Sequence, residues 1–99
     1  MSIVVAQPDI LSGAAGDLQS INAALQAGNA AAAGPTTMVA PAAADAVSIL
    51  TAAQFSAHAQ LYQAISAQGA WAQEQLATVL GICAGSYAAT EAANSTMVG

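Results

Sequence analysis

Residues 29–45 read NAAAAGPTTMVAPAAAD, and this stretch separates the two long alanine-rich segments of the chain. Its Gly34-Pro35 pair interrupts the helical pattern, because proline disfavours helical geometry in the residue before it. On either side, residues 8–33 and 45–93 carry apolar residues at helical spacing. We therefore predict one all-α domain over residues 1–99, with a helix at about 8–33, a connector at 34–44 and a second helix at about 45–93.

Both segments carry signals for the start of a helix. Pro8 fits the first helical turn, where its missing N–H group would be unpaired in any case, and Asp9 places a negative charge at the positive end of the helix dipole. Asp45 is a good N-cap, since its carboxylate can accept hydrogen bonds from the first turn. At the other end, Gly81 and Gly85 are candidates to end the second helix early.

The apolar residues of both segments follow a heptad spacing. In the first segment Leu11, Leu18 and Leu25 recur every seven residues, and a companion row consists of Ala14, Ile21 and Gly28. In the second segment a seam alternates by three and four and comprises Phe55, His58, Tyr62, Ile65, Gly69, Ala72, Leu76, Val79 and Cys83. Further apolar residues beside this seam make the stripe wider than one facing helix covers. We predict a two-helix antiparallel hairpin that completes a helical bundle with a partner chain.

The expected partner interface consists of large side chains on both helices. They are Leu11, Leu18, Ile21, Leu25, Phe55, Leu61, Tyr62, Ile65, Leu76 and Leu80. Each such side chain moved from water into an interface contributes about 1.5 to 3 kcal/mol before ordering costs. We therefore expect the chain to aggregate or to be poorly ordered when it is expressed alone.

Charge composition excludes several classes of partner. The chain has no Lys and no Arg against five acids, and its formal net charge is −5. Nucleic acids and anionic lipid surfaces both attract basic side chains, so we expect no nucleic-acid partner. The uncharged stretch 18–44 holds several amides and the Gly34-Pro35 break, which argues against a transmembrane span. The start Met1–Val5 lacks a basic residue, so we expect no conventional signal peptide.

The chemistry-bearing residues do not form a recognisable catalytic or metal site. His58 and Cys83 lie 25 positions apart on one predicted helix, roughly 37 Å along its axis, which is far beyond the reach that a nucleophile and its base require. No second metal-ligating side chain accompanies His58. The acids include no pair at helical spacing. We expect no enzyme, no cofactor and no small-molecule substrate. Trp71 is equally compatible with an interface anchor and with a partly buried surface aromatic.

Several short motifs occur together and in a fixed order. They are Pro8-Asp9, NAAAAGPTT at 29–37, PAAAD at 41–45, Val47-Ser48, LTAAQF at 50–55 and SYAATE at 86–91. In this combination the chain resembles the PE domain of mycobacteria over nearly its whole length. It differs in one respect, because the family is named for Pro-Glu and this chain has Pro8-Asp9. An acid in the first helical turn preserves the favourable interaction with the helix dipole.

The resemblance implies a function. PE domains pair with PPE-family proteins to form a helical bundle and leave the cell through a type VII secretion system. Tyr87 and Glu91 match the Tyr-x-x-x-Asp/Glu export signal of this family, and partner chains carry a Trp-x-Gly turn, which Trp71-Ala72-Gln73 does not match. The implied partners are a PPE-family protein, the secretion machinery and, through the partner, a secretion chaperone. The implied location is the cell surface or the medium, after assembly in the cytoplasm.

Two alternatives use the same apolar stripe in a different way. A self-associating structural protein, such as a homodimeric four-helix bundle, would bury the stripe against a second copy. A cell-surface or membrane-acting helical protein would bury it against lipid, although basic anchors for an anionic surface are missing.

Overall fold

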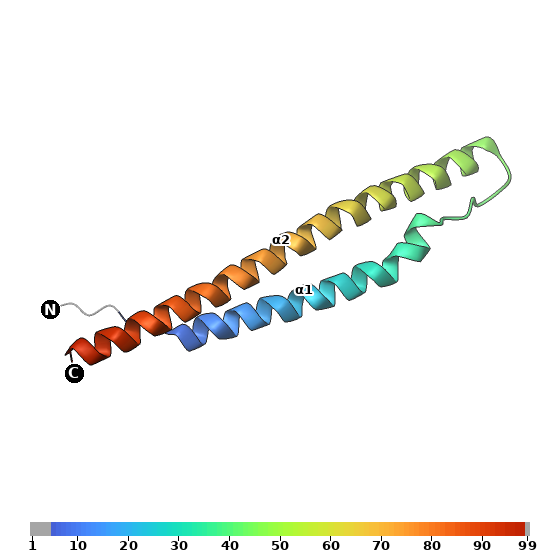
Figure 1. Cartoon of the computed structure of the whole chain (residues 1–99). Coiled ribbons are helices and arrows are strands. Elements are labelled where there is room, and N and C mark those ends of the chain that lie inside the picture. The colour runs from blue at the N-terminus through green and yellow to red at the C-terminus, as the bar shows by residue number, and fades with distance from the viewer. Residues whose placement is uncertain (1–4, 99) are drawn as a thin grey trace. The chain divides into compact units, whose positions relative to one another are not determined.

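A computed structural model describes residues 5–98. Over this range the chain forms two long helices and no strand, α1 (Pro8–Thr37) and α2 (Ala46–Val98) (Figure 1). The prediction of an all-α chain with two long helices is confirmed for these residues. The expectation about a signal peptide rests mainly on residues 1–4, which lie outside this range. Two compact units share the helices: Asn22–Trp71, here the connector unit, and the described residues up to Ile21 together with those from Ala72 onward, here the terminal unit.

Helix α1 begins where the sequence indicated. The backbone N–H groups of Ile10 and Leu11 both donate to the Gln7 carbonyl, at 3.1 and 3.3 Å. Pro8 is the first helical residue and has no N–H to leave unpaired, so its position is favourable. Asp9 lies in the first turn, as predicted.

The predicted end of α1 at residue 33 was wrong, because the helix passes through Pro35 and ends at Thr37. The additional turn is held by the residues that follow the proline. Thr36 Oγ1 donates to the Ala32 carbonyl at 2.6 Å, and the Met38 N–H donates to the Gly34 carbonyl at 3.2 Å. These bonds offset the donor that Pro35 lacks. The connector therefore covers residues 38–45 and not 34–44.

Helix α2 is capped by Asp45 and starts one residue after it. The Ser48 N–H donates to Asp45 Oδ1 at 2.8 Å and the Ser48 hydroxyl donates to Oδ2 at 2.9 Å, so the N-cap prediction is confirmed. The predicted end at 93 was too early, since α2 continues to Val98. Gly81 and Gly85 do not interrupt it, and neither has a positive φ. Glycine lowers helix stability without forbidding helical geometry.

In the connector unit, hydrogen bonds between the two helical segments show that they run in opposite directions. Asn22 Nδ2 donates to the Ala70 carbonyl at 3.1 Å, and Gln63 Nε2 donates to the Asn29 carbonyl at 2.9 Å. As residue numbers rise in α1, those of the bonded partners fall in α2. Within this unit the hairpin is antiparallel.

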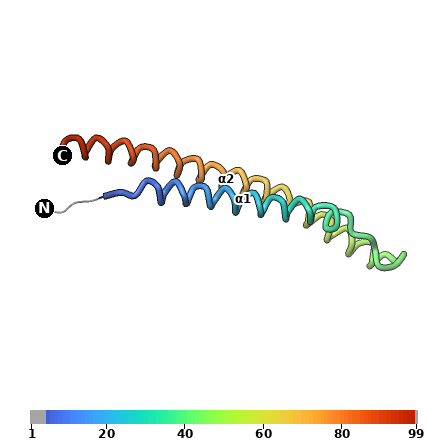
Figure 2. Tube along the Cα trace, turned by 90° about the horizontal axis from the view of Figure 1, so that it is seen from below, coloured from blue at the N-terminus to red at the C-terminus, as the bar shows by residue number. Residues whose placement is uncertain are grey.

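In the terminal unit, the two helical segments lie side by side in both views (Figures 1 and 2). Ala15 of α1 and Ala77 and Ala84 of α2 are buried there. Small side chains allow two helix backbones to approach closely. Among the described residues of the whole chain, the only further buried hydrophobic residue is Ala52, so the hydrophobic core contains no large side chain.

The residues of α2 that face α1 within each unit form a heptad row that sequence analysis missed. This inner row consists of buried and half-buried residues: Ala52, Ser56, Ala59, Gln63, Ser66, Ala70, Gln73, Ala77, Leu80 and Ala84. The predicted seam beginning at Phe55 lies one residue before each of the positions from Ser56 to Ala84, and all of its members are exposed. In α1, the Leu11 and Leu18 row does turn inward, but its companions are Ala15, Asn22 and Asn29 and not Ala14, Ile21 and Gly28.

Candidate functional site

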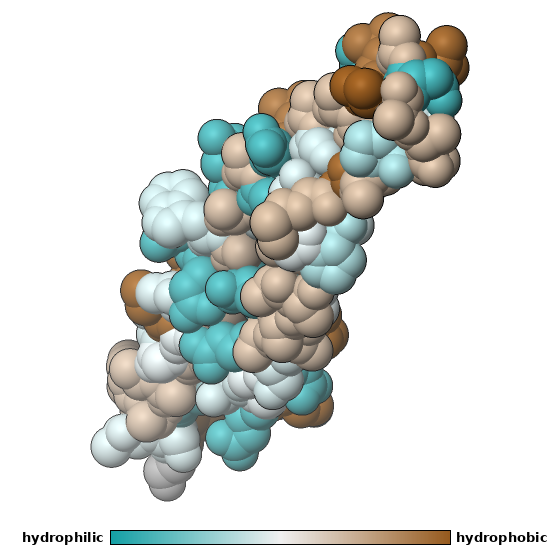
Figure 3. Space-filling model, turned by 90° about the vertical axis from the view of Figure 1, so that its right-hand side faces the viewer, coloured by the Kyte–Doolittle hydropathy of each residue, from teal (hydrophilic) through white to brown (hydrophobic). Residues whose placement is uncertain are grey.

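The predicted seam of α2 forms an exposed apolar surface. We define this outer row by its nine residues, which are Phe55, His58, Tyr62, Ile65, Gly69, Ala72, Leu76, Val79 and Cys83. Phe55 is 63% exposed and Ile65 is 58% exposed. A helix turns by about 100° per residue, so a row one position before the inner row lies to the side of the face that meets α1. Figure 3 shows hydrophobic residues, in brown, open to the surface on the face in view.

The ten residues predicted for a partner interface divide into two groups. Leu11, Leu18 and Leu80 are half-buried and contribute to the contact between the helices of this chain. The other seven are exposed: Ile21, Leu25, Phe55, Leu61, Tyr62, Ile65 and Leu76. Their exposure keeps them available for a partner, and whether a partner covers them stays a prediction.

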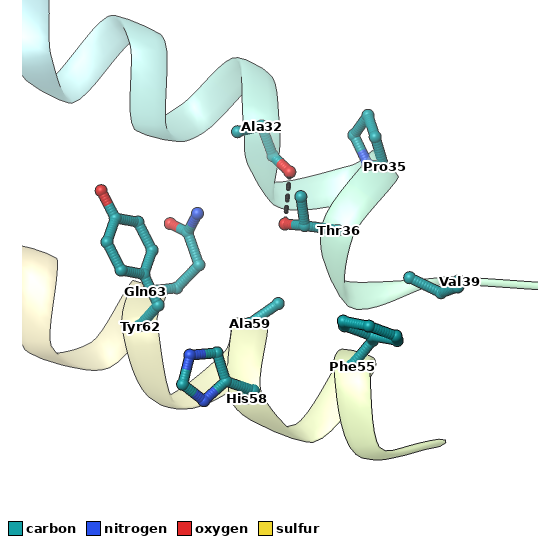
Figure 4. A pocket seen from close by; sticks show the side chains of 9 residues that line it. All are labelled: Ala32, Pro35, Thr36, Val39, Phe55, His58, Ala59, Tyr62 and Gln63. Carbon is teal, nitrogen blue, oxygen red and sulfur yellow. Dashed lines mark hydrogen bonds between the residues drawn. The ribbon is translucent and has the colours of Figure 1, made fainter. Parts of the chain in front are cut away.

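A groove lies beside the outer row at the start of α2. It measures about 340 Å³ and lies between the end of α1 and residues 55–63 of α2. Pro35 and Val39 border it on one side, and Phe55 and Tyr62 border it on the other. In Figure 4, Tyr62 and Gln63 point from α2 toward α1, and Phe55 lies next to Val39. Tyr62 is held in place because its hydroxyl donates to Asn29 Oδ1 at 2.9 Å.

Tyr87 and Glu91 lie on α2 in the terminal unit, one helical turn apart. Residues four apart lie on the same helix face. Tyr87 is 50% exposed, whereas Glu91 is half-buried. The carboxylate of Glu91 accepts a hydrogen bond from the backbone N–H of Ala6 at 3.1 Å. The two residues are therefore not equivalent, since the ring is open to solvent and the carboxylate is partly engaged by its own chain.

This hydrogen bond also brings together two sequence motifs from opposite ends of the chain. Ala6 lies two residues before the Pro8-Asp9 pair, and Glu91 ends the Tyr87 motif. The bonded residues are 85 positions apart. No sequence pattern indicated this contact, because its donor is a backbone group that any residue except proline provides.

The remaining singled-out residues are His58, Cys83 and Trp71. His58 belongs to the connector unit and Cys83 to the terminal unit, and both are exposed. Trp71 is 68% exposed, outside the inner row. Within residues 5–98, no group of three or more His, Cys, Asp or Glu side chains is placed to hold a metal ion.

Asn22 is a buried polar residue that sequence analysis did not single out. Its side chain is 1% exposed and donates to the Ala70 carbonyl, while its Oδ1 has no partner among the described residues. The sequence signal for Asn22 is its place in α1, four residues after Leu18 on the inward face, because a polar residue in a heptad seam specifies register at some cost in stability.

Sequence comparisons place the chain in a family. Residues 4–94 match the PE family. The chain is 56% identical over 95 residues to PE family protein PE13 of Mycobacterium tuberculosis, a match that covers 96% of each chain. It is 50% identical over 98 residues to PE-PGRS family protein PE_PGRS8 of the same species, covering 99% of this chain and 56% of that protein.

Longer relatives contain the same segment as one part of a larger protein. The match to PE cleavage protein A of Mycobacterium marinum is 53% identical over 92 residues, covering 93% of this chain but 17% of that protein. The chain thus spans nearly the full length of PE13 and only part of the other two relatives. With its two helices and a match over residues 4–94, this chain belongs to the PE family.

Proposed function

We propose that this chain is a non-enzymatic heterodimerisation module. It pairs with a PPE-family protein, completes a helical bundle with it, and carries Tyr87 and Glu91 as an export signal for a type VII secretion system. After assembly in the cytoplasm, the pair is delivered to the cell surface or the medium. A secretion chaperone acts on the pair through the PPE-family protein.

The division of α2 into two rows is the observation that carries the pairing. Within each unit, the inner row makes the contact with α1 mainly through small and polar side chains. The large apolar side chains of the outer row are exposed. Contiguous exposed apolar surface on a soluble chain marks an interaction site. A helical partner is favoured, because the outer row keeps the three-and-four spacing that fits a facing helix.

Co-expression tests the pairing. This chain is produced alone and together with a candidate PPE-family protein, and the soluble fraction is weighed by light scattering. We expect a soluble one-to-one complex from the co-expression and aggregate or poorly ordered material from the chain alone. Failure of every candidate PPE-family protein to form such a complex would contradict the proposal.

Parallel measurement of pairing and secretion tests the export role. Tyr87→Ala should block export and leave the heterodimer intact, because Tyr87 is half-exposed and lies near the C-terminal end of α2. Glu91→Ala should do the same. Loss of both pairing and export in these variants would reassign Tyr87 and Glu91 to packing.

One observation supports an alternative role for the chain at a membrane. Of the described helices, α2 alone is long and apolar enough to cross a membrane by length and composition, although such a helix is weak support by itself. Flotation of the intact complex with liposomes tests this role. The same light-scattering measurement on the chain alone distinguishes self-association from pairing, because a homodimer would form without a second protein.

A further inference from the structure

The bond between Ala6 and Glu91 gives the terminal unit a feature that the export motif alone does not contain. The Ala6 N–H donates to Glu91 Oε1 at 3.1 Å, and both residues are half-buried. Val5, just before Ala6, is 63% exposed, and Tyr87, one turn before Glu91, is half-exposed. The carboxylate therefore fastens the segment that leads into α1 to the part of α2 that carries Tyr87.

This bond requires a backbone N–H at position 6, which every residue except proline provides, and an accepting side chain at position 91. A carboxylate that accepts from a backbone N–H forms a charge-assisted hydrogen bond, which is stronger than a neutral one. The donor at position 6 is lost only when proline replaces the residue. The acceptor at position 91 is lost in alanine but retained in glutamine, whose side-chain oxygen also accepts.

We propose that Glu91 is a positioning residue, and that the recognised export element consists of residues 5–7 together with Tyr87. This inference rests on the export function proposed above. Glu91, which follows Tyr87 by one helical turn, holds the N-terminal segment at this part of α2, and the secretion machinery recognises the exposed groups of this segment together with Tyr87. In this arrangement, the negative charge serves the chain's own backbone and is not the group that the machinery reads.

The experiment uses the full chain in complex with its PPE-family partner, in a host with an active type VII system. The variants are Glu91→Ala, Glu91→Gln, Ala6→Pro, Tyr87→Ala and the double variant Ala6→Pro with Glu91→Ala. Glu74→Ala is the matched control, because it removes the other glutamate of α2, which is exposed. Two quantities are measured for each: the exported fraction of the pair, and hydrogen exchange at the position 6 amide of the purified heterodimer wherever that amide exists.

The expected pattern separates positioning from direct recognition. In Glu91→Ala, exchange at Ala6 should accelerate roughly tenfold, the scale of a lost charged hydrogen bond, and export should fall by a similar factor. Ala6→Pro should lower export by the same factor. The double variant should lower it no further, because the two changes break the same hydrogen bond. Glu91→Gln should retain protection and export within about twofold, as the side-chain oxygen still accepts. Glu74→Ala should match the unchanged chain.

Three results would overturn the proposal. Two of them leave the export function intact, and the third removes it. Normal export of Ala6→Pro beside failed export of Glu91→Ala shows that the carboxylate is read directly, and the export function then stands. If the Ala6 amide of Glu91→Gln stays protected from hydrogen exchange but export fails, the carboxylate is again recognised directly. Normal export of both Glu91→Ala and Tyr87→Ala removes the export function itself. Where Ala6→Pro lowers the yield of heterodimer, the comparison of Glu91→Gln with Glu91→Ala decides alone.

Discussion

The inner and outer rows of α2 lie one residue apart on the same helix but differ in side-chain size. The inner row is dominated by Ala, Ser and Gln and faces α1 within each unit, and the outer row holds Phe55, Ile65 and Leu76 in solvent. Small residues permit close backbone approach but remove little apolar surface from water. The hairpin is thus shaped by its small residues, while most of the large apolar residues remain free to contribute to a second interface.

The largest expected effect comes from placing a charge in the outer row. In Ile65→Glu, the pairing proposal predicts a loss of binding to the PPE-family partner of about 2 kcal/mol or more, or about thirtyfold in Kd, because a charge would be buried without a counterion. Titration of the purified chains measures it. Gln60→Glu adds the same charge at an exposed position outside both rows and should bind normally. Equal Kd values for the two variants would refute the assignment of the outer row.

A second change enlarges a side chain in the inner row. Ala77 is 2% exposed, so Ala77→Leu should force the two helical segments of the terminal unit apart at a cost of about 1 to 3 kcal/mol. Urea unfolding of the heterodimer measures the free energy. Ala53→Leu adds the same atoms at an exposed position of α2 and should have little effect. Similar stabilities would mean that Ala77 does not lie in a close contact.

A third change concerns the polar part of the inner contact. Asn22→Ala removes the bond to the Ala70 carbonyl and should lower the free energy of unfolding by about 1 kcal/mol, the usual net value of one hydrogen bond. The unpaired Oδ1 of Asn22 disappears in the same variant, which offsets part of the loss. Urea unfolding again gives the value. An increase in the free energy of unfolding would show that the Asn22 bond does not stabilise the fold and that Asn22 only specifies the register of the two helical segments.

The smallest effect is a pH dependence at the start of α2, in the connector unit. The backbone N–H of Ser48, followed by its hydroxyl, holds the pKa of Asp45 below its ordinary value of 3.8. A lowered pKa in the folded state means that the stabilisation is present above the unfolded pKa and is lost as pH falls through the folded pKa. Stability should therefore decline below about pH 4. Asp45→Asn should lack this component of the decline, as measured by thermal unfolding between pH 2 and about pH 6.

The helices could be predicted from sequence because their signals are local. Pro8 and Asp45 marked the two helix starts correctly, since first-turn chemistry depends on neighbouring residues only. The end at residue 33 was wrong because Thr36 and Met38 restore hydrogen bonds after Pro35, and this depends on geometry that composition does not show.

The inner row was missed because apolar periodicity points to the largest side chains. Phe55 and Leu76 carry the strongest apolar signal, and the adjacent Ser56 and Ala77 carry almost none, although the latter two face α1 within their units. In a chain whose helices meet through alanine, the most hydrophobic stripe does not mark the contact between its own helices. The Ala6–Glu91 bond was missed for a different reason, namely that its donor is a backbone group.

The proposed need of the outer row for a second chain is best tested by comparing the isolated chain with the co-expressed pair. Sedimentation and thermal unfolding are followed on both samples. We expect aggregation or non-cooperative unfolding for the isolated chain, and a one-to-one complex with a single cooperative transition for the pair. A monodisperse, cooperatively melting monomer of the isolated chain would contradict this expectation.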